Sequence, residues 1–218
     1  MKFHRFVLNA RRTGLALIIA VATALSSQLM AQADNQMAIP PQSQQDGTWS
    51  GARLGTSPTE TIGSAGCAIT AVAMMLRYFD INTDPAALNA WLTASGGYAF
   101  DDQLIWNAVT AYSAGRVTFT NWLGPDLGVI EQELDASHPV IAEVQLAGNM
   151  HFVLITGYTA QGGLMINDPW FGDTVPLGAR YGGIISIRTF TAPVPSGVRA
   201  DGRVLWVTNA TQSGYLAR

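Results

Sequence analysis

The 218-residue chain has a single cysteine and three histidines, and these small numbers exclude several kinds of site. One thiol cannot form an intramolecular disulfide, and it cannot supply the sets of cysteine and histidine that bind structural zinc. The sequence also lacks a glycine-rich phosphate-binding loop, which argues against nucleotide chemistry. The sequence therefore predicts a protein that needs no metal and no organic cofactor.

Positive charge is scarce except at the N-terminus. Lys2, Arg5, Arg11 and Arg12 precede an apolar stretch over residues 15–25 and the motif Ala31-Gln32-Ala33. This pattern is typical of a signal peptide, so we expect residues 1–33 to be removed after Ala33, by the Sec route or by the twin-arginine route that Arg11-Arg12 suggests. The alternative is an uncleaved membrane anchor, for which the apolar stretch is short. The predicted location is secreted or periplasmic.

The remaining sequence is acidic. Residues 34–218 carry eight arginines and no lysine against 15 acidic residues, a formal charge of −7. Nucleic acids and anionic membrane surfaces bind basic patches, so neither is an expected partner. No later apolar run is long enough to cross a bilayer. We expect a soluble monomer whose partner is a peptide or protein substrate.

The first half of this region is predicted to be helical. We expect an extended lead-in over residues 34–48, and then helices over 67–79, 86–92 and 102–112. Asp84 and Pro85 have the pattern of an N-cap and a first helical residue. Asp101 is expected to cap the third helix rather than to bind a metal, because it has no ligand-spaced companions.

The second half is rich in β-branched residues. We expect strands over residues 117–122, 139–146, 151–158, 164–167 and 183–190, a helix over 127–137, and one more strand over 203–208. Gly162 and Gly163 indicate a hairpin turn. Helices followed by consecutive strands predict an α+β domain with an antiparallel sheet. We expect this domain to span residues 49–191, followed by a tail of unassigned role over 192–218.

Cys67 follows Gly66 at the start of the first predicted helix. A thiol attacks as the thiolate, which a helix N-terminus and a nearby imidazolium both stabilise. His138 precedes a proline at a predicted helix end and fits a cap or surface residue. His151 opens an apolar strand, where one polar side chain could face the helix start. We interpret Cys67 as a nucleophile and His151 as its base. The alternative for Cys67 is a small buried apolar residue.

An imidazole base needs an acceptor for its second nitrogen. Asn167 and Asp168 end the strand that follows His151, and only one of them can face His151 because successive strand side chains alternate. A chain reversal near residues 159–160 would place Asp168 opposite His151. A reversal centred on residues 162–163 would instead move Asp168 away from His151 along the strand.

A tetrahedral intermediate also needs two donors for its oxyanion. The backbone N–H of Cys67 can supply one of them. A side-chain amide upstream could supply the other, and Gln42, Gln44 and Gln45 are all candidates by chemistry alone.

Five segments together resemble the C39-like, papain-like cysteine peptidases. They are Ser-Gln-Gln-Asp-Gly-Thr-Trp at 43–49, Gly-Cys-Ala at 66–68, Pro-Val-Ile-Ala at 139–142, His-Phe-Val-Leu-Ile-Thr-Gly-Tyr at 151–158, and Ile-Asn-Asp-Pro-Trp at 166–170. The resemblance implies a papain-like α+β fold, with an N-terminal helical half packed on a C-terminal antiparallel sheet.

The resemblance also implies roles for four residues. Cys67 would be the nucleophile, His151 the general base and acid, and Asp168 the residue that orients His151. Gln44 lies five residues before Trp49, where the family has its oxyanion-hole glutamine. The implied function is an exported hydrolase that cleaves peptide bonds through a thioester. The alternatives are an acyltransferase that uses the same thioester, and a peptide-binding module without catalysis.

Overall fold

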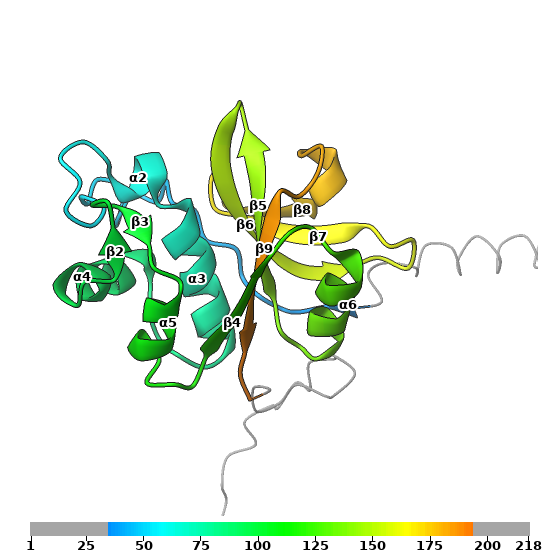
Figure 1. Ribbon diagram of the computed structural model, residues 1–218. Helices are drawn as coiled ribbons and strands as arrows, with labels where there is room; N and C mark the ends of the chain where they lie inside the picture. Colours follow the sequence, from blue (N-terminus) through cyan, green and yellow to red (C-terminus); the bar gives the residue numbers. More distant parts are fainter. Residues whose placement is uncertain (1–34, 194–218) are drawn as a thin grey trace, which may run out of the picture.

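The computed structural model of the protein describes residues 35–193. Its helices are α2 (Ile62–Ala65), α3 (Cys67–Tyr78), α4 (Pro85–Ala94), α5 (Asn107–Tyr112) and α6 (Leu127–Asp135). Helices α3, α4 and α5 lie together on one side of a sheet, and α6 lies across the sheet from them (Figure 1). No helix within the described range is long and apolar enough to span a membrane. The expected signal peptide and the strand expected over 203–208 lie outside the described residues.

The sheet is antiparallel and has β6 near its middle. Its order is β4 (Thr118–Leu123), β9 (Ser186–Thr191), β5 (Val140–Leu146), β6 (Asn149–Tyr158), β7 (Leu164–Asp168) and β8 (Asp173–Pro176). A short strand at the start of the described chain, β1 (Asn35–Gln36), pairs with the last two residues of β6. The α+β class and its antiparallel sheet are therefore confirmed.

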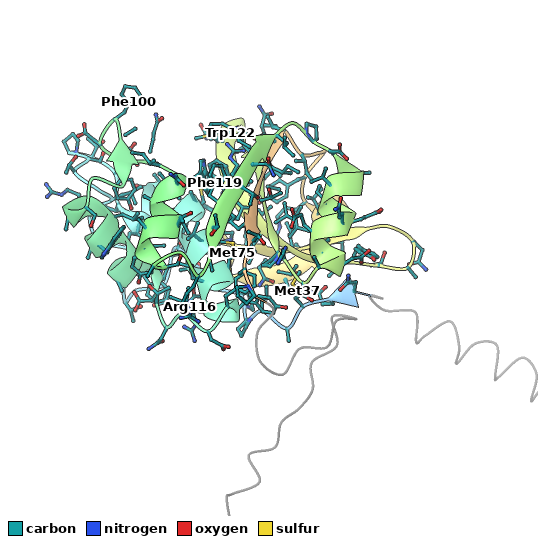
Figure 2. All side chains as sticks on the ribbon, turned by 60° about the horizontal axis from the view of Figure 1, so that its bottom comes forward. Met37, Met75, Phe100, Arg116, Phe119 and Trp122 are labelled. Atoms are coloured by element: carbon teal, nitrogen blue, oxygen red, sulfur yellow. The ribbon has the colours of Figure 1, made fainter. Side chains whose placement is uncertain are left out.

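Helix α3 is the centre of the helical half. Every residue from Ile69 to Leu76 is buried, as expected for a helix that is apolar on nearly all sides. The helix packs against β6, the strand that carries His151. Met75 on α3 and Met37 in the lead-in both lie inside the molecule (Figure 2). The lead-in predicted to be extended over residues 34–48 contains β1 and then no regular element through residue 43, and turns begin at residue 44. Met37 and Ile39 of this segment belong to the core.

The predicted helix over 102–112 is wrong at its start. Residues 98–104 instead form a hairpin of β2 (Tyr98–Ala99) and β3 (Gln103–Leu104), and the helix begins only at Asn107. Phe100 and Asp101 have φ values of 47° and 73°, which a helix cannot contain. Asp101 caps no helix, because its carboxylate and carbonyl accept hydrogen bonds from Thr56 at 2.7 and 2.9 Å. Phe100 projects from this hairpin (Figure 2).

The register between β6 and β7 falls between the two that were expected. Leu154 pairs with Asn167, so the partner of Asp168 by extension is Val153, two residues from His151. A bulge between Ile155 and Gly157 shifts the register nearer the turn. The turn itself is closed by hydrogen bonds between Thr159 and residues 162–163. Asp168 is thus a diagonal neighbour of His151 on the same face, within reach of its ring.

Candidate active site

Cys67 begins α3 directly after the short helix α2. Reciprocal hydrogen bonds between Thr61 and Ser64 cap α2. Gly66 then joins the two helices, and a Cβ atom there would lie 2.4 Å from the carbonyl oxygen of Ile62. Gly66 is also the N-cap of α3 and offers no capping side chain. The half-buried thiol of Cys67 therefore lies at the positive end of a 12-residue helix that no side chain has capped.

His151 lies between Cys67 and Asp168. Its Nε2 atom is 2.9 Å from Oδ1 of Asp168, which leaves Nδ1 as the nitrogen available to the Cys67 thiol. Burial of His151 opposes its positive charge, but Asp168 and the nearby Cys67 raise its pKa to about 9. The raised pKa favours the protonated ring at neutral pH.

Asp168 is completely buried and accepts four hydrogen bonds. Oδ1 accepts from His151 and from the backbone N–H of Trp170, whereas Oδ2 accepts from Arg180 at 2.9 Å and from the Tyr181 hydroxyl at 2.5 Å. Burial alone would raise the pKa of Asp168, but the bonds from His151, Tyr181 and Arg180 lower it to about 2. Asp168 is therefore an anion whose acceptor sites are all occupied.

Asn167 faces away from His151. Its side-chain amide donates to the carbonyl oxygen of Ile39 at 2.7 Å, and its carbonyl accepts from Thr174 at 2.6 Å. Because the two side chains alternate along β7, Asp168 is the acceptor that reaches the ring and Asn167 fixes the lead-in against the sheet.

His138 belongs to another part of the molecule. Its ring nitrogens lie 2.9 Å from a Glu133 carboxylate oxygen and 3.0 Å from the Ala192 carbonyl oxygen. The ring lies beside Phe79, the C-cap residue of α3, whereas Cys67 is at the opposite end of that helix, about 18 Å away. His138 therefore joins the end of α6 to the residue after β9, and it lies away from Cys67.

Of the three candidate glutamines, Gln44 is the buried one. It is 1% exposed, and its backbone N–H donates to the carbonyl oxygen of Pro169 at 2.7 Å. Its Nε2 atom donates to the Gly63 carbonyl at 2.9 Å, and its contact with the Ile62 carbonyl is long, at 3.4 Å. Gln44 thus lies against α2, just before Cys67, with one amide hydrogen committed to Gly63. Its Oε1 atom is buried and has no partner.

Neither of the other two glutamines is buried. Gln45 is exposed, although its amide reaches the Gly63 carbonyl at 2.6 Å. The backbone N–H of Gln42 lies 3.1 Å from the sulfur of Met74, two helical turns beyond Cys67. Gln42 thus lies beside the middle of α3 rather than at its start.

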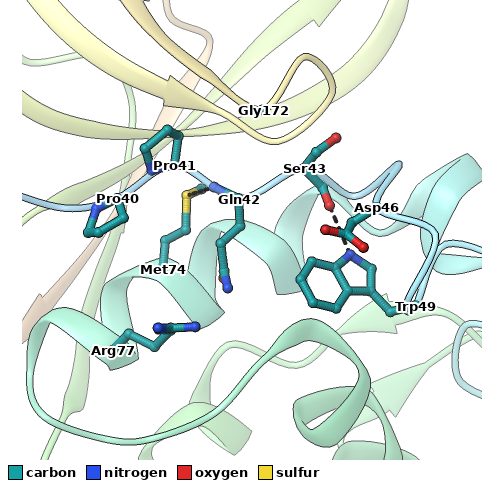
Figure 3. A pocket seen from close by; sticks show the side chains of 9 residues that line it. All are labelled: Pro40, Pro41, Gln42, Ser43, Asp46, Trp49, Met74, Arg77 and Gly172. Atoms are coloured by element: carbon teal, nitrogen blue, oxygen red, sulfur yellow. Dashed lines mark hydrogen bonds between the residues drawn. The ribbon is translucent and has the colours of Figure 1, made fainter.

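A cavity of about 410 Å³ lies between residues 40–49, the segment that includes Gln44, and the second half of α3 (Figure 3). It is lined by Pro40, Pro41, Gln42, Ser43, Asp46, Trp49, Met74, Arg77 and Gly172. The indole of Trp49 donates to the Ser43 carbonyl at its edge. Neither Cys67 nor His151 lines this cavity, so it is not the place where the thiol would meet a substrate.

Arg180 and Tyr181 are the site residues that the sequence did not reveal. They follow a single turn of 3-10 helix, η1 (Leu177–Ala179), in a stretch where no element was predicted. The only available signal was the pair of acidic residues that flanks the turn between β7 and β8. Two carboxylates so close together favour a cation between them, and Arg180 is the cation that follows them in the sequence.

A thiol at the start of a helix lies near a buried histidine and a fully hydrogen-bonded carboxylate, and these last two are on adjacent strands. This arrangement is that of a cysteine peptidase-like α+β domain. A comparison with family models agrees with this class. The chain belongs to the Peptidase_C39 like family, whose model matches residues 36–178. No curated protein matches the chain.

Proposed function

We propose that the protein is an exported cysteine peptidase with a papain-like arrangement, and that it cleaves peptide bonds through a thioester on Cys67. The observation that carries this proposal is that His151 is hydrogen-bonded to the buried Asp168 and lies close to the Cys67 thiol at the start of α3. In the proposed enzyme, residues 1–33 direct export, and a domain over 49–191 carries the site together with Gln44 from the lead-in over 34–48.

In the acylation step the Cys67 thiolate attacks the carbonyl carbon of the substrate. The oxyanion accepts hydrogen bonds from the backbone N–H of Cys67 and from the second amide hydrogen of Gln44. When the intermediate collapses, the C–N bond breaks and His151 gives its Nδ1 proton to the leaving amine. The product of this step is a thioester with a neutral imidazole beside it.

In the deacylation step water replaces the amine. Neutral His151 removes a proton from water, the resulting hydroxide attacks the thioester, and the C–S bond breaks to release the acid. The thiolate and the imidazolium are then restored. Asp168 keeps Nε2 of His151 protonated through both steps, so only Nδ1 exchanges protons with the substrate.

The pKa of His151 sets one limit of activity. A resting thiolate–imidazolium pair requires a protonated ring, and this ring loses its proton near pH 9. The proposed enzyme should therefore lose activity as pH rises through about 9.

A peptide-binding module without catalysis is the second candidate. It is favoured by Gln44, because its amide already donates to the Gly63 carbonyl and its Oε1 atom has no partner. If that amide cannot turn toward a substrate, the oxyanion would have only one donor. Equal peptide affinity for the wild type and Cys67→Ala, with no product from either, would support this candidate.

Two measurements test the proposed function. The first is turnover of a mixed peptide library by the protein without residues 1–33, with Cys67→Ala and His151→Ala as variants. Product that forms with the wild type and disappears in both variants supports a peptidase, whereas normal turnover by Cys67→Ala would refute it. The second is N-terminal sequencing of protein recovered outside the cytoplasm, which should begin at Asp34.

A further inference from the structure

Each carboxylate oxygen of Asp168 accepts two hydrogen bonds. Oδ1 faces His151, and Oδ2 faces away from it. Arg180 donates through Nη1, and Tyr181 donates through its hydroxyl, both to Oδ2. Both donors lie outside the part of the chain that matches the family model, which ends at residue 178. The aromatic ring of Tyr181 also lies 6.0 Å from the ring of His151.

Arg180 is held in place independently of Asp168. Its Nη1 and Nη2 atoms donate to the two carboxylate oxygens of Asp173, each at 2.8 Å. Its guanidinium also lies over the ring of Phe171, 4.0 Å from the centroid. A guanidinium fixed by a two-point bond and by an aromatic face is already oriented when it meets Asp168.

The two carboxylates that share Arg180 are direct cross-strand partners. Asp168 ends β7 and Asp173 begins β8, and the register pairs them with each other. Like charges placed opposite one another in a sheet repel. Arg180 bridges them, which is a sufficient structural reason for its presence. A role in catalysis therefore has to be separated from this structural role by experiment.

We propose that Arg180 and Tyr181 are positioning residues of the site, and that they limit how strongly Asp168 holds the proton on His151. This inference rests on the proposed function. Two donors on Oδ2 fix the carboxylate plane, so Oδ1 stays aligned with Nε2 of His151. They also draw negative charge away from Oδ1 and make Asp168 a weaker acceptor.

The consequence concerns proton release. His151 must give its Nδ1 proton to the leaving amine, and an imidazolium with a higher pKa is a weaker acid. Four other titratable groups lie around His151 and Asp168. They are the Cys67 thiol, the Arg180 guanidinium, the Tyr181 hydroxyl and the Asp173 carboxylate. Of these, Arg180 and Tyr181 oppose the pull of Asp168 on the proton.

The experiment is an NMR titration of the His151 ring in the wild type, Arg180→Gln, Tyr181→Phe and Arg180→Lys. We expect the pKa of His151 to rise by about half a unit to one unit in Arg180→Gln, and by less in Tyr181→Phe. Arg180→Lys keeps the charge but loses the two-point bond to Asp173, so its effect on the pKa of His151 should be smaller than that of Arg180→Gln. In turnover assays we expect kcat to fall about tenfold in Arg180→Gln with KM unchanged.

Matched controls separate positioning from stability. Tyr158→Phe removes a comparable hydroxyl, which donates to Asp135 at 2.7 Å, and Arg116→Gln removes an arginine that donates to the Phe79 carbonyl. Neither should move the pKa of His151. If Arg180→Gln and Tyr181→Phe lower only the melting temperature and leave the pKa of His151 and kcat unchanged, the proposal is refuted. Because the titration needs no turnover, it decides the point even for a protein that cleaves nothing.

Discussion

Replacing Asp168 by asparagine tests the ion pair between Asp168 and His151 most directly. The amide keeps the size of the carboxylate but removes its charge. Asparagine offers one acceptor oxygen where Asp168 has two, and four donors converge on Asp168. If the amide oxygen faces His151, the amide nitrogen faces Arg180 and Tyr181, which are also donors. The substitution therefore weakens both the charge balance and the local hydrogen bonding.

The size of the effect follows from the pKa of His151. That pKa is about 9, and an unperturbed histidine has a pKa of about 6.5. Loss of the Asp168 charge and hydrogen bond should remove most of this difference, or about 2 units, which corresponds to about 3 kcal/mol. The thiolate–imidazolium pair should then be about 100-fold less populated relative to the neutral thiol and imidazole. Unpaired donors facing the amide should cost about 1–3 kcal/mol each in folding stability.

The assay is the rate of iodoacetamide alkylation of Cys67, followed by mass spectrometry from pH 5 to 10. We expect fast labelling of the wild type well below pH 8.5, the pKa of a free thiol. Labelling of Asp168→Asn at pH 6 should be about 100-fold slower. Asp135→Asn is the control, because Asp135 also accepts two side-chain hydrogen bonds, from Asn35 and Tyr158, but lies away from the thiol. Equal labelling of the wild type and a folded Asp168→Asn variant at pH 6 would refute the reasoning.

Three further variants probe other parts of the structure. Gly66→Ala should slow alkylation of Cys67 at least tenfold, because the new methyl group meets the Ile62 carbonyl, whereas Gly124→Ala, in open space, should be neutral. His138→Gln should lose more stability in urea at pH 5.5 than at pH 8.5. The hydrogen bond to Glu133 raises the pKa of His138, so its contribution is complete below about pH 6.5 and declines as pH rises through the higher folded value. Gly157→Ala should lower the unfolding free energy by about 1–3 kcal/mol, measured by urea denaturation, because its Cβ would lie 2.1 Å from the Asn35 carbonyl oxygen and displace β1.

Sequence patterns located the elements that have strong local signals. Helix α3 was predictable because it is apolar over three turns, and α4 because Asp84 and Pro85 mark its start. The side chain of Asp84 does accept from the N–H of Ala87, at 2.7 Å. The β2–β3 hairpin was missed because its turn places Phe100 and Asp101 at positive φ without a glycine. Tertiary hydrogen bonds to Thr56, which no local pattern shows, hold that turn in place.

The residues of the candidate site also divide into those that sequence patterns could locate and those that they could not. The chemistry of Cys67 and His151 could be inferred from residue type and position, because few alternatives were present. The acceptor could be narrowed to two residues, but the choice of Asp168 depended on a register that a bulge at residues 155–157 alters. Arg180 and Tyr181 have only an indirect signal, the nearby acidic pair Asp168 and Asp173. Their role becomes visible only when the folded chain brings them to the Asp168 carboxylate.

The hydrogen bonds that hold the lead-in against the end of β7 join residues far apart in the sequence. This separation affects the order in which the chain folds. The bond from Asn167 to Ile39 joins residues 128 positions apart, and the backbone bond from Gln44 to Pro169 joins segments nearly as distant. Contacts of such high order form late, because the chain must first close a large loop. In the proposed enzyme, a partly folded or incompletely synthesised chain would hold Cys67 before Gln44 reaches its place beside the start of α3, so the site would be completed only at the end of folding.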